Sequence, residues 1–197
     1  MRLLRLGKIA YYADFYVYPI VIIALAAFAI SRGPTGGWAT WLGAFAAGVA
    51  LWTLVEYLLH RFVLHHVPMI KDMHDAHHKD QLALIGTPIW ISLSIMVALV
   101  LVPLSYVAER HIAIGLACGL MFGHFWYGGV HHILHHWKAE PGTYLFRLKR
   151  RHMLHHHFDE MGNFGVTSGF WDIVFGTDVK VRVAAATPGT RDREHRQ

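Results

Sequence analysis

Four long apolar runs are the feature that most constrains how this chain folds. An α-helix rises 1.5 Å per residue and needs about 20 residues to cross a hydrocarbon layer of about 30 Å. The runs meet that length and lie at residues 11–30, 38–59, 82–106 and 112–130. Charged residues make up only 16% of the chain, against roughly 25% in soluble domains. The sequence therefore predicts an all-α membrane protein with four transmembrane helices, the first of them a retained span rather than a cleaved signal peptide.

Lysine and arginine are distributed unevenly between the segments that join these runs. If the N-terminus lies inside, the inner segments 1–10, 60–81 and 131–197 hold sixteen of the eighteen basic residues, and only Arg32 and Arg110 fall outside. Basic residues gather on the cytosolic side of membrane proteins. We therefore expect an integral, multi-pass membrane protein with both termini in the cytosol. The same distribution explains the net charge of +5 without a nucleic-acid partner.

Most of the seventeen histidines lie just after the second and the fourth run. The first group occupies residues 60–78, and the second occupies residues 131–136 and 152–157. Because two spans separate the inner ends of these runs, both groups emerge on the same face of the membrane. Neutral imidazole is the commonest protein ligand for metals such as iron and zinc, and uncompensated polar clustering beside a bilayer is costly. We expect the two groups to form one metal site in a helical cap on the inner face.

Helical spacing decides which of these histidines converge. Residues 74–78 carry histidines at positions i, i+3 and i+4, which share one face of a helix, and residues 152–156 repeat that pattern. His131 and His135 form an i, i+4 pair at the end of the fourth run. These residues are therefore predicted to point toward a common centre.

The pair at the end of the second run has a different spacing, because His60 and His65 are five residues apart. A regular helix would separate their side chains by about 140°, so we expect the second span to break or widen near Val63. Each half of the chain then supplies a pair from a span and a triplet from the following segment. Ten imidazoles suit two metals, since one metal takes roughly four to six ligands. The candidate ligands are His60, His65, His74, His77, His78, His131, His135, His152, His155 and His156.

Carboxylates and the remaining histidines are expected to have supporting or unrelated roles. Soluble di-iron bundles use Glu-x-x-His pairs, which this sequence lacks, so the prediction is an all-imidazole site. Glu56 and Asp75 are each placed to accept a ring N–H from a candidate ligand. His124, inside the fourth run, is either a buried hydrogen-bonded residue or a neighbour of the ligands. Four further histidines adjoin the ligands but should point elsewhere: His66, His132, His136 and His157. The lone Cys118 excludes an intrachain disulfide and a cysteine-based cluster.

The histidine motifs resemble those of the fatty acid hydroxylase/sterol desaturase superfamily of membrane di-metal oxygenases. The matching segments are HRFVLH (60–65), HDAHH (74–78), HHILH (131–135), HMLHH (152–156) and the closing motif NFGVTSGFWDIVFGT (163–177). The stretch EYLLHRFVLH is most similar to the fatty acid 2-hydroxylase branch. The resemblance runs from about residue 56 to residue 177, which is most of the chain.

This resemblance implies two iron ions held by the ten candidate ligands, although zinc can occupy such sites in a purified sample. It also implies that dioxygen is activated and that a lipid acyl chain, such as that of a fatty acid or ceramide, is hydroxylated. Asn163 would be a further polar neighbour of the metals. Phe164, Phe170 and Trp171 are expected to line the slot for the acyl chain. We expect a single fatty acid hydroxylase-like domain at 1–179, with a cap formed by 60–81 and 131–179. The polar segment 180–197, which lacks periodicity, is expected to be a disordered tail.

Two departures from the family pattern leave alternatives open. Larger 2-hydroxylases carry a fused haem domain of the b-type cytochrome kind, and there is no room for one before Glu56, so we expect a separate electron donor of cytochrome or ferredoxin type. The gap between His65 and His74 is short, which leaves the substrate open to a sterol or carotenoid. The alternatives from other classes are a membrane metal transporter or metal-binding protein, and a haem protein with two histidine ligands. Both are less consistent with histidines crowded at helix ends.

Overall fold

The structure is a computed structural model that describes residues 6–180, and its regular elements in that range are all helices. The predicted tail from residue 180 therefore lies outside the described residues, apart from Lys180 itself. In chain order the elements are α1 (Lys8–Arg32), α2 (Trp38–Leu58), the π-helix η2 (Leu59–Leu64), α3 (Ile70–Lys79), α4 (Ile89–Ile95), the π-helix η3 (Met96–Leu101), α5 (Val102–Val107), α6 (Arg110–His136), α7 (Tyr144–His157) and α8 (Phe170–Val174).

Four helical stretches in the described chain are long and apolar enough to cross a membrane. They are Lys8–Arg32, Trp38–Leu64, Ile89–Val107 and Arg110–His136. Many of their large apolar side chains face outward, and Ile20, Ile23 and Leu99 are each about two-thirds exposed or more. Such outer surfaces suit contact with lipid. The predicted all-α chain with four candidate membrane spans is confirmed.

The third and fourth spans have different limits from those predicted. The third helix begins at Ile89 rather than near residue 82, because Pro88 stands at its N-terminus in an extended conformation and disfavours helix in the residue before it. The fourth helix continues without interruption to His136, six residues beyond the predicted end of the apolar run. Its last turns therefore carry the histidines of residues 131–136 out of the apolar region on a rigid element.

Close contact between α2 and α6 sets the register of the whole bundle. Three glycines on α6, at 115, 119 and 123, recur every four residues and face α2. A Cβ at Gly119 would stand 2.1 Å from the backbone oxygen of Phe45, and one at Gly48 of α2 would stand 2.3 Å from that of Leu116. Small residues at this spacing let membrane helices approach at backbone distance. The contact brings the histidine-bearing ends of α2 and α6 together.

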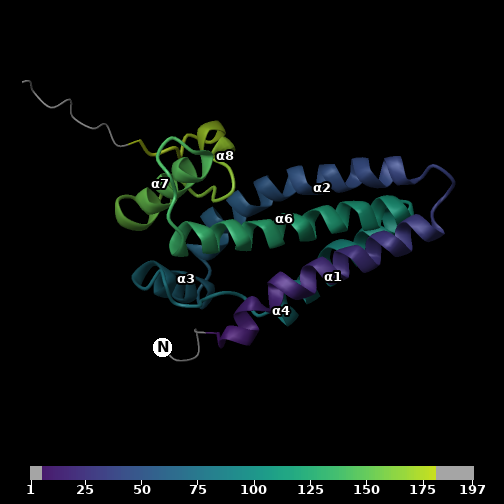
Figure 1. The fold of residues 1–197 in the computed structure, drawn as a ribbon, viewed down its shortest axis with the longest axis horizontal. Helices are drawn as coiled ribbons and strands as arrows, with labels where there is room; N and C mark the ends of the chain where they lie inside the picture. Colours follow the sequence, from purple (N-terminus) through teal and green to yellow (C-terminus); the bar gives the residue numbers. More distant parts are fainter. Residues whose placement is uncertain (1–5, 181–197) are drawn as a thin grey trace, which may run out of the picture.

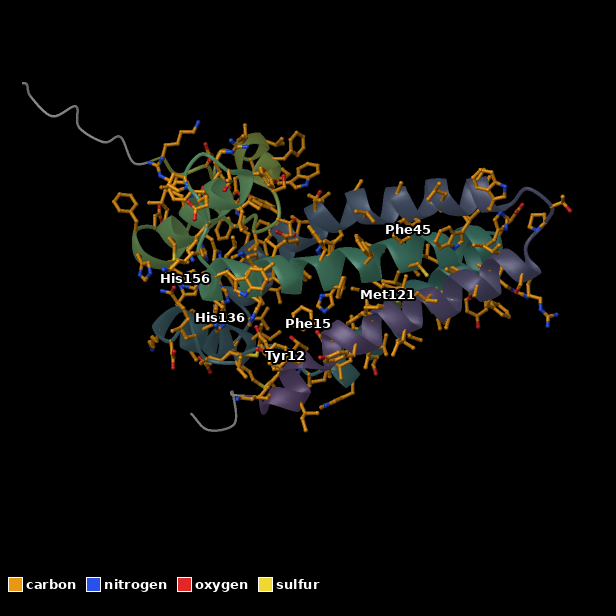
Figure 2. The ribbon with its side chains drawn as sticks, viewed as in Figure 1. Tyr12, Phe15, Phe45, Met121, His136 and His156 are labelled. Atoms are coloured by element: carbon orange, nitrogen blue, oxygen red, sulfur yellow. The ribbon has the colours of Figure 1, made fainter. Side chains whose placement is uncertain are left out.

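The other helices complete the bundle around this pair. Tyr18 of α1 and Met96 of η3 pack with Trp52, Leu120 and Met121 in one buried cluster. The helices α3, α7 and α8 gather at one end of the bundle, opposite the 33–37 turn (Figure 1). His156 and His136 lie at this end, whereas Phe45 and Met121 lie along the spans (Figure 2). Both histidine groups thus emerge at the same end, as predicted.

Candidate metal centre

The ten predicted ligands lie together in two groups of five. Within each group, one nitrogen from each ring lies within 4.8 Å of those of the other four. Group A is His60, His65, His74, His78 and His155, and group B is His77, His131, His135, His152 and His156. Each group therefore draws on both halves of the sequence.

The middle histidine of each helical triplet (74, 77, 78 and 152, 155, 156) belongs to a different group from the two histidines beside it. His77 of α3 joins the pair from α6 in group B, and His155 of α7 joins the pair at η2, His60 and His65, in group A. On a helix, position i+3 lies about 60° to one side of position i, and position i+4 lies about 40° to the other. Each triplet therefore faces two centres at once. This exchange was not predicted from the sequence.

The π-helix η2 explains how His60 and His65 meet. A π-helix forms i→i+5 hydrogen bonds and brings residues five apart onto one face. The two rings lie nearly parallel, at an interplanar angle of 18°, with their centroids 5.3 Å apart. The predicted widening near Val63 is confirmed, since η2 spans Leu59–Leu64.

The ring nitrogens approach one another as ligands of a shared ion would. In group A, Nε2 of His74 lies 3.0 Å from Nε2 of His78 and 3.1 Å from that of His60. In group B, Nε2 of His135 lies 2.8 Å from Nε2 of His152. Nitrogens that share one ion at about 2.0–2.1 Å lie about 3–4 Å from each other. The nitrogen–nitrogen distances and the all-imidazole donor set therefore fit a metal ion in each group.

Burial keeps these rings neutral. It lowers the pKa of His77 and of His78 to about 4, with neighbouring imidazoles adding to the effect. Burial likewise lowers the pKa of His155 to about 3. The pKa is lowered for the same first reason in His65, His74, His152 and His156. At neutral pH each ring therefore has a lone pair available to a cation.

One loop fixes the orientation of two rings in group A. We call residues 162–167 the strap. Nδ1 of His60 donates to the carbonyl oxygen of Phe164 at 2.6 Å, and Nδ1 of His155 donates to that of Gly162 at 2.8 Å. Since a carbonyl only accepts, both rings carry their proton on Nδ1. Their Nε2 atoms are left free to bind a metal.

Two buried carboxylates hold the strap in place. Glu56 accepts hydrogen bonds from the backbone N–H groups of Val166 and Thr167 at 2.6 and 2.8 Å, and from the Thr167 hydroxyl at 2.6 Å. Asp172 accepts from the backbone N–H groups of Phe164 and Gly165 at 2.8 and 2.9 Å. The expectation that Glu56 accepts directly from a ligand ring is therefore corrected. It acts on the strap, one helical turn before His60.

The other predicted neighbours of the ligands also have different partners. Asp75 pairs with Lys71 at 2.5 Å, and Asn163 exchanges hydrogen bonds with the backbone of Val179. His124 lies 3.6 Å from Asp14 of α1, inside α6 and away from the end of that helix that carries the candidate ligands. Histidines expected to point elsewhere have their own contacts, for example His132 with Tyr11 and His157 with Gln81. None of these four histidines (66, 132, 136, 157) belongs to group A or B.

A mainly apolar cavity of about 210 Å³ opens onto both groups. Its lining includes His60 and His74 of group A and His77 and His131 of group B. From there it extends between α1, α2 and α6, where apolar side chains surround the Asp14–His124 pair. The lining away from the histidines includes Phe15, Trp52, Leu59, Phe125 and Tyr127.

The aromatic residues expected to line the slot lie outside this cavity. Phe164 is fully buried against the rings of His60, His65 and His155. Trp171 donates to the hydroxyl of Thr53 at 2.9 Å, and Phe170 is 57% exposed. The sequence placed them in the closing motif but gave no indication of which side of the strap they occupy.

The fold and the site together define an all-helical membrane protein with a histidine cluster at one end of its bundle. A sequence model of the fatty acid hydroxylase family matches residues 45–177. The chain belongs to this family, and the predicted resemblance is confirmed.

The chain is also similar in sequence and structure to proteins that are named as hydroxylases. The fatty acid 2-hydroxylase of Rattus norvegicus is 33% identical over 148 residues, which cover 69% of this chain and 39% of that protein. The dihydroceramide fatty acyl 2-hydroxylase FAH1 of Arabidopsis thaliana is 31% identical over 183 residues, covering 82% of this chain and 72% of that protein. A solved structure of full-length scs7p, in which only the hydroxylase domain is visible, aligns with a TM-score of 0.73 and 25% identity over 91% of this chain and 69% of that one. The chain thus spans about two-fifths of the length of the rat relative.

Proposed function

We propose that this protein is a membrane di-metal oxygenase that hydroxylates a lipid acyl chain, of the fatty acid or ceramide kind. Membership of the fatty acid hydroxylase family supports the reaction class. The relatives named as 2-hydroxylases of fatty acids and of dihydroceramide acyl chains support the substrate class and the position oxidised. The observation that carries the proposal is the convergence of ten imidazoles in two groups, each of which contributes two rings to the lining of an apolar cavity.

We propose that groups A and B each hold one iron ion. Ten buried or half-buried imidazoles with converging nitrogens support this assignment, and zinc would fit the same donor set. When bound, iron would supply the activation of dioxygen that the attack on an unactivated C–H bond requires. The chain's own contribution is to fix the ten rings on four rigid elements and to keep them neutral.

The cavity is the proposed site of the acyl chain. Its apolar side chains, Phe15, Leu59 and Phe125 among them, would hold methylene groups by burial and exclude water from the histidines. Asp14 and His124 are an ionisable pair in the cavity lining between the spans, where Glu56 also lies, and intramembrane ionisable pairs generally mark functional sites. We propose that this pair hydrogen-bonds a polar atom of the substrate.

The proposed orientation places both termini and the histidine cluster in the cytosol. The distribution of lysine and arginine supports this choice. Electrons would come from a separate cytochrome- or ferredoxin-type protein. We further propose that residues 1–179 form one domain, with residues 60–81 and 131–179 as its cap.

A comparison of lipids by mass spectrometry tests this function. The full chain is expressed in cells beside a His155→Ala variant and a His66→Ala control, which changes an exposed histidine outside both groups. Acyl chains that gain one oxygen with wild type and His66→Ala, and not with His155→Ala, support the proposal. Altered sterols or hydroxylated carotenoids in place of oxidised acyl chains would contradict the proposed substrate class. Unchanged lipids in cells whose expressed protein contains its metal ions would contradict the proposed hydroxylation.

A further inference from the structure

The two histidine groups differ in what their ring nitrogens contact away from the centre. In group A, Nδ1 of His60 and Nδ1 of His155 each donate to a carbonyl of the strap. In group B, Nδ1 of His135, His152 and His156 is buried and has no hydrogen-bond partner among residues 6–180.

The strap that supports group A is itself firmly anchored. Glu56 and Asp172 are 3% and 0% exposed, and together they accept hydrogen bonds from four consecutive backbone N–H groups, those of residues 164–167. Arg151 lies 3.0 Å from Asp172 and neutralises its charge. The strap carbonyls are therefore held at fixed positions before any ion binds.

An acceptor on the far nitrogen matters for metal affinity. It fixes the tautomer that leaves Nε2 unprotonated, holds the ring at one angle and raises the basicity of the ligand atom. Removing such an acceptor typically lowers metal affinity by about 10- to 100-fold. A ring whose Nδ1–H is buried without an acceptor lacks this support and retains an unsatisfied donor. Two of the five rings in group A thus have this support, whereas three of the five rings in group B have a buried Nδ1 without it.

We infer that the two metal positions are unequal: group A holds its ion tightly and the strap is its positioning device, whereas group B holds an ion that exchanges readily. This inference rests on the proposed metal centre. Glu56 and Asp172 are positioning residues, because they act on His60 and His155 through the backbone of the strap. All ten ligands are imidazoles, so the difference between the two ions arises from the contacts around the ligands. One ion would then be replaceable and the other would stay bound.

A metal-release titration of the purified full chain in detergent tests the inference, with Zn²⁺ as the probe. The protein is loaded with Zn²⁺, equilibrated with rising concentrations of EDTA, and the metal remaining is counted by mass spectrometry of the elements. The expected result is release in two steps, separated by at least about 10-fold in EDTA concentration. His152→Ala should abolish the early step, because it removes a group B ligand. His74→Ala should abolish the late step.

The strap is tested with Asp172→Asn and with a milder variant, Thr167→Val, which removes only one bond to Glu56. Both should move the late step toward the early one, Asp172→Asn by about 10-fold or more, and leave the early step in place. Asp75→Asn is the matched control, because its carboxylate pairs with Lys71 and does not touch the strap. Circular dichroism checks that each variant remains helical.

Each outcome bears on the inference. Two Zn²⁺ ions released together from wild type would overturn it while leaving the metal centre standing. Two steps that Thr167→Val and Asp172→Asn leave unmoved would overturn the role of the strap. Wild-type protein that binds no Zn²⁺ and no iron would overturn the proposed metal centre itself.

Discussion

The rings of His78 and His156 stack with their centroids 4.1 Å apart and their planes at 15°, although His78 belongs to group A and His156 to group B. Both are the last members of their triplets, on α3 and α7. The two groups are therefore in direct contact through these two rings, so that ions bound in them could act on one substrate.

Loss of a single group A ligand should remove one ion and the activity. We expect His155→Ala to retain one metal ion instead of two and to lower lipid oxidation by more than about 100-fold, since even the loss of a partner to a ligand costs about 10- to 100-fold. Metal content per chain and oxidised lipid are the measurements. His157→Ala is the control, because its ring contacts Gln81 at the surface. Full metal content and full activity in His155→Ala would rule out its role as a ligand.

The spacing of His60 and His65 across the π-helix should be needed for group A. Inserting an alanine after Val63 would place these histidines six residues apart and turn their side chains about 120° from each other on an α-helix, so that His65 leaves His60. We expect the insertion variant to lose the group A ion while keeping its helical content. Val63→Ala, which keeps the chain length, should keep both ions. An insertion variant with two tightly held ions would show that this spacing is dispensable.

The α2–α6 contact should tolerate no side chain at its closest point. In Gly119→Ala the new Cβ would meet the Phe45 backbone oxygen at 2.1 Å, and such overpacking costs about 1–3 kcal/mol. We expect lower thermal stability in detergent. Gly128→Ala on the same helix meets nothing within 4 Å and should be neutral or slightly stabilising, because alanine favours helix. Equal stability of the two variants would be inconsistent with the close packing described above.

Filling the cavity should reduce activity without disturbing the metals. Leu59 lines the cavity and its neighbour Leu58 does not, although the two side chains are similarly exposed, at 41% and 38%. We expect Leu59→Trp to lower acyl-chain oxidation by about 10-fold or more, because the indole would occupy space that methylene groups need. Leu58→Trp should behave as wild type. If both variants were fully active, the acyl chain would have to lie elsewhere.

Much of this architecture could be predicted because it follows from local patterns. Apolar runs of membrane length predicted the four spans, and an even number of crossings placed both histidine groups at one end. The five-residue gap between His60 and His65 conflicted with α-helical geometry, and that conflict correctly predicted the widened turn.

What could not be predicted depends on how distant segments meet. The exchange of His77 and His155 depends on where α3 and α7 lie relative to the histidines of η2 and α6, which no local pattern encodes. Glu56 lies within reach of His60 on the same helix, yet it bonds a strap more than a hundred residues away. The glycines at 115, 119 and 123 are the sequence signal from which the close helix packing could have been predicted.

The number of metal ions bound per chain tests the central claim most directly. Purified full chain, loaded with iron under reducing conditions and freed of excess metal, should contain two ions, and His155→Ala and His152→Ala should each contain one. A wild-type ratio near zero, or a ratio of two that neither substitution lowers, would contradict the account.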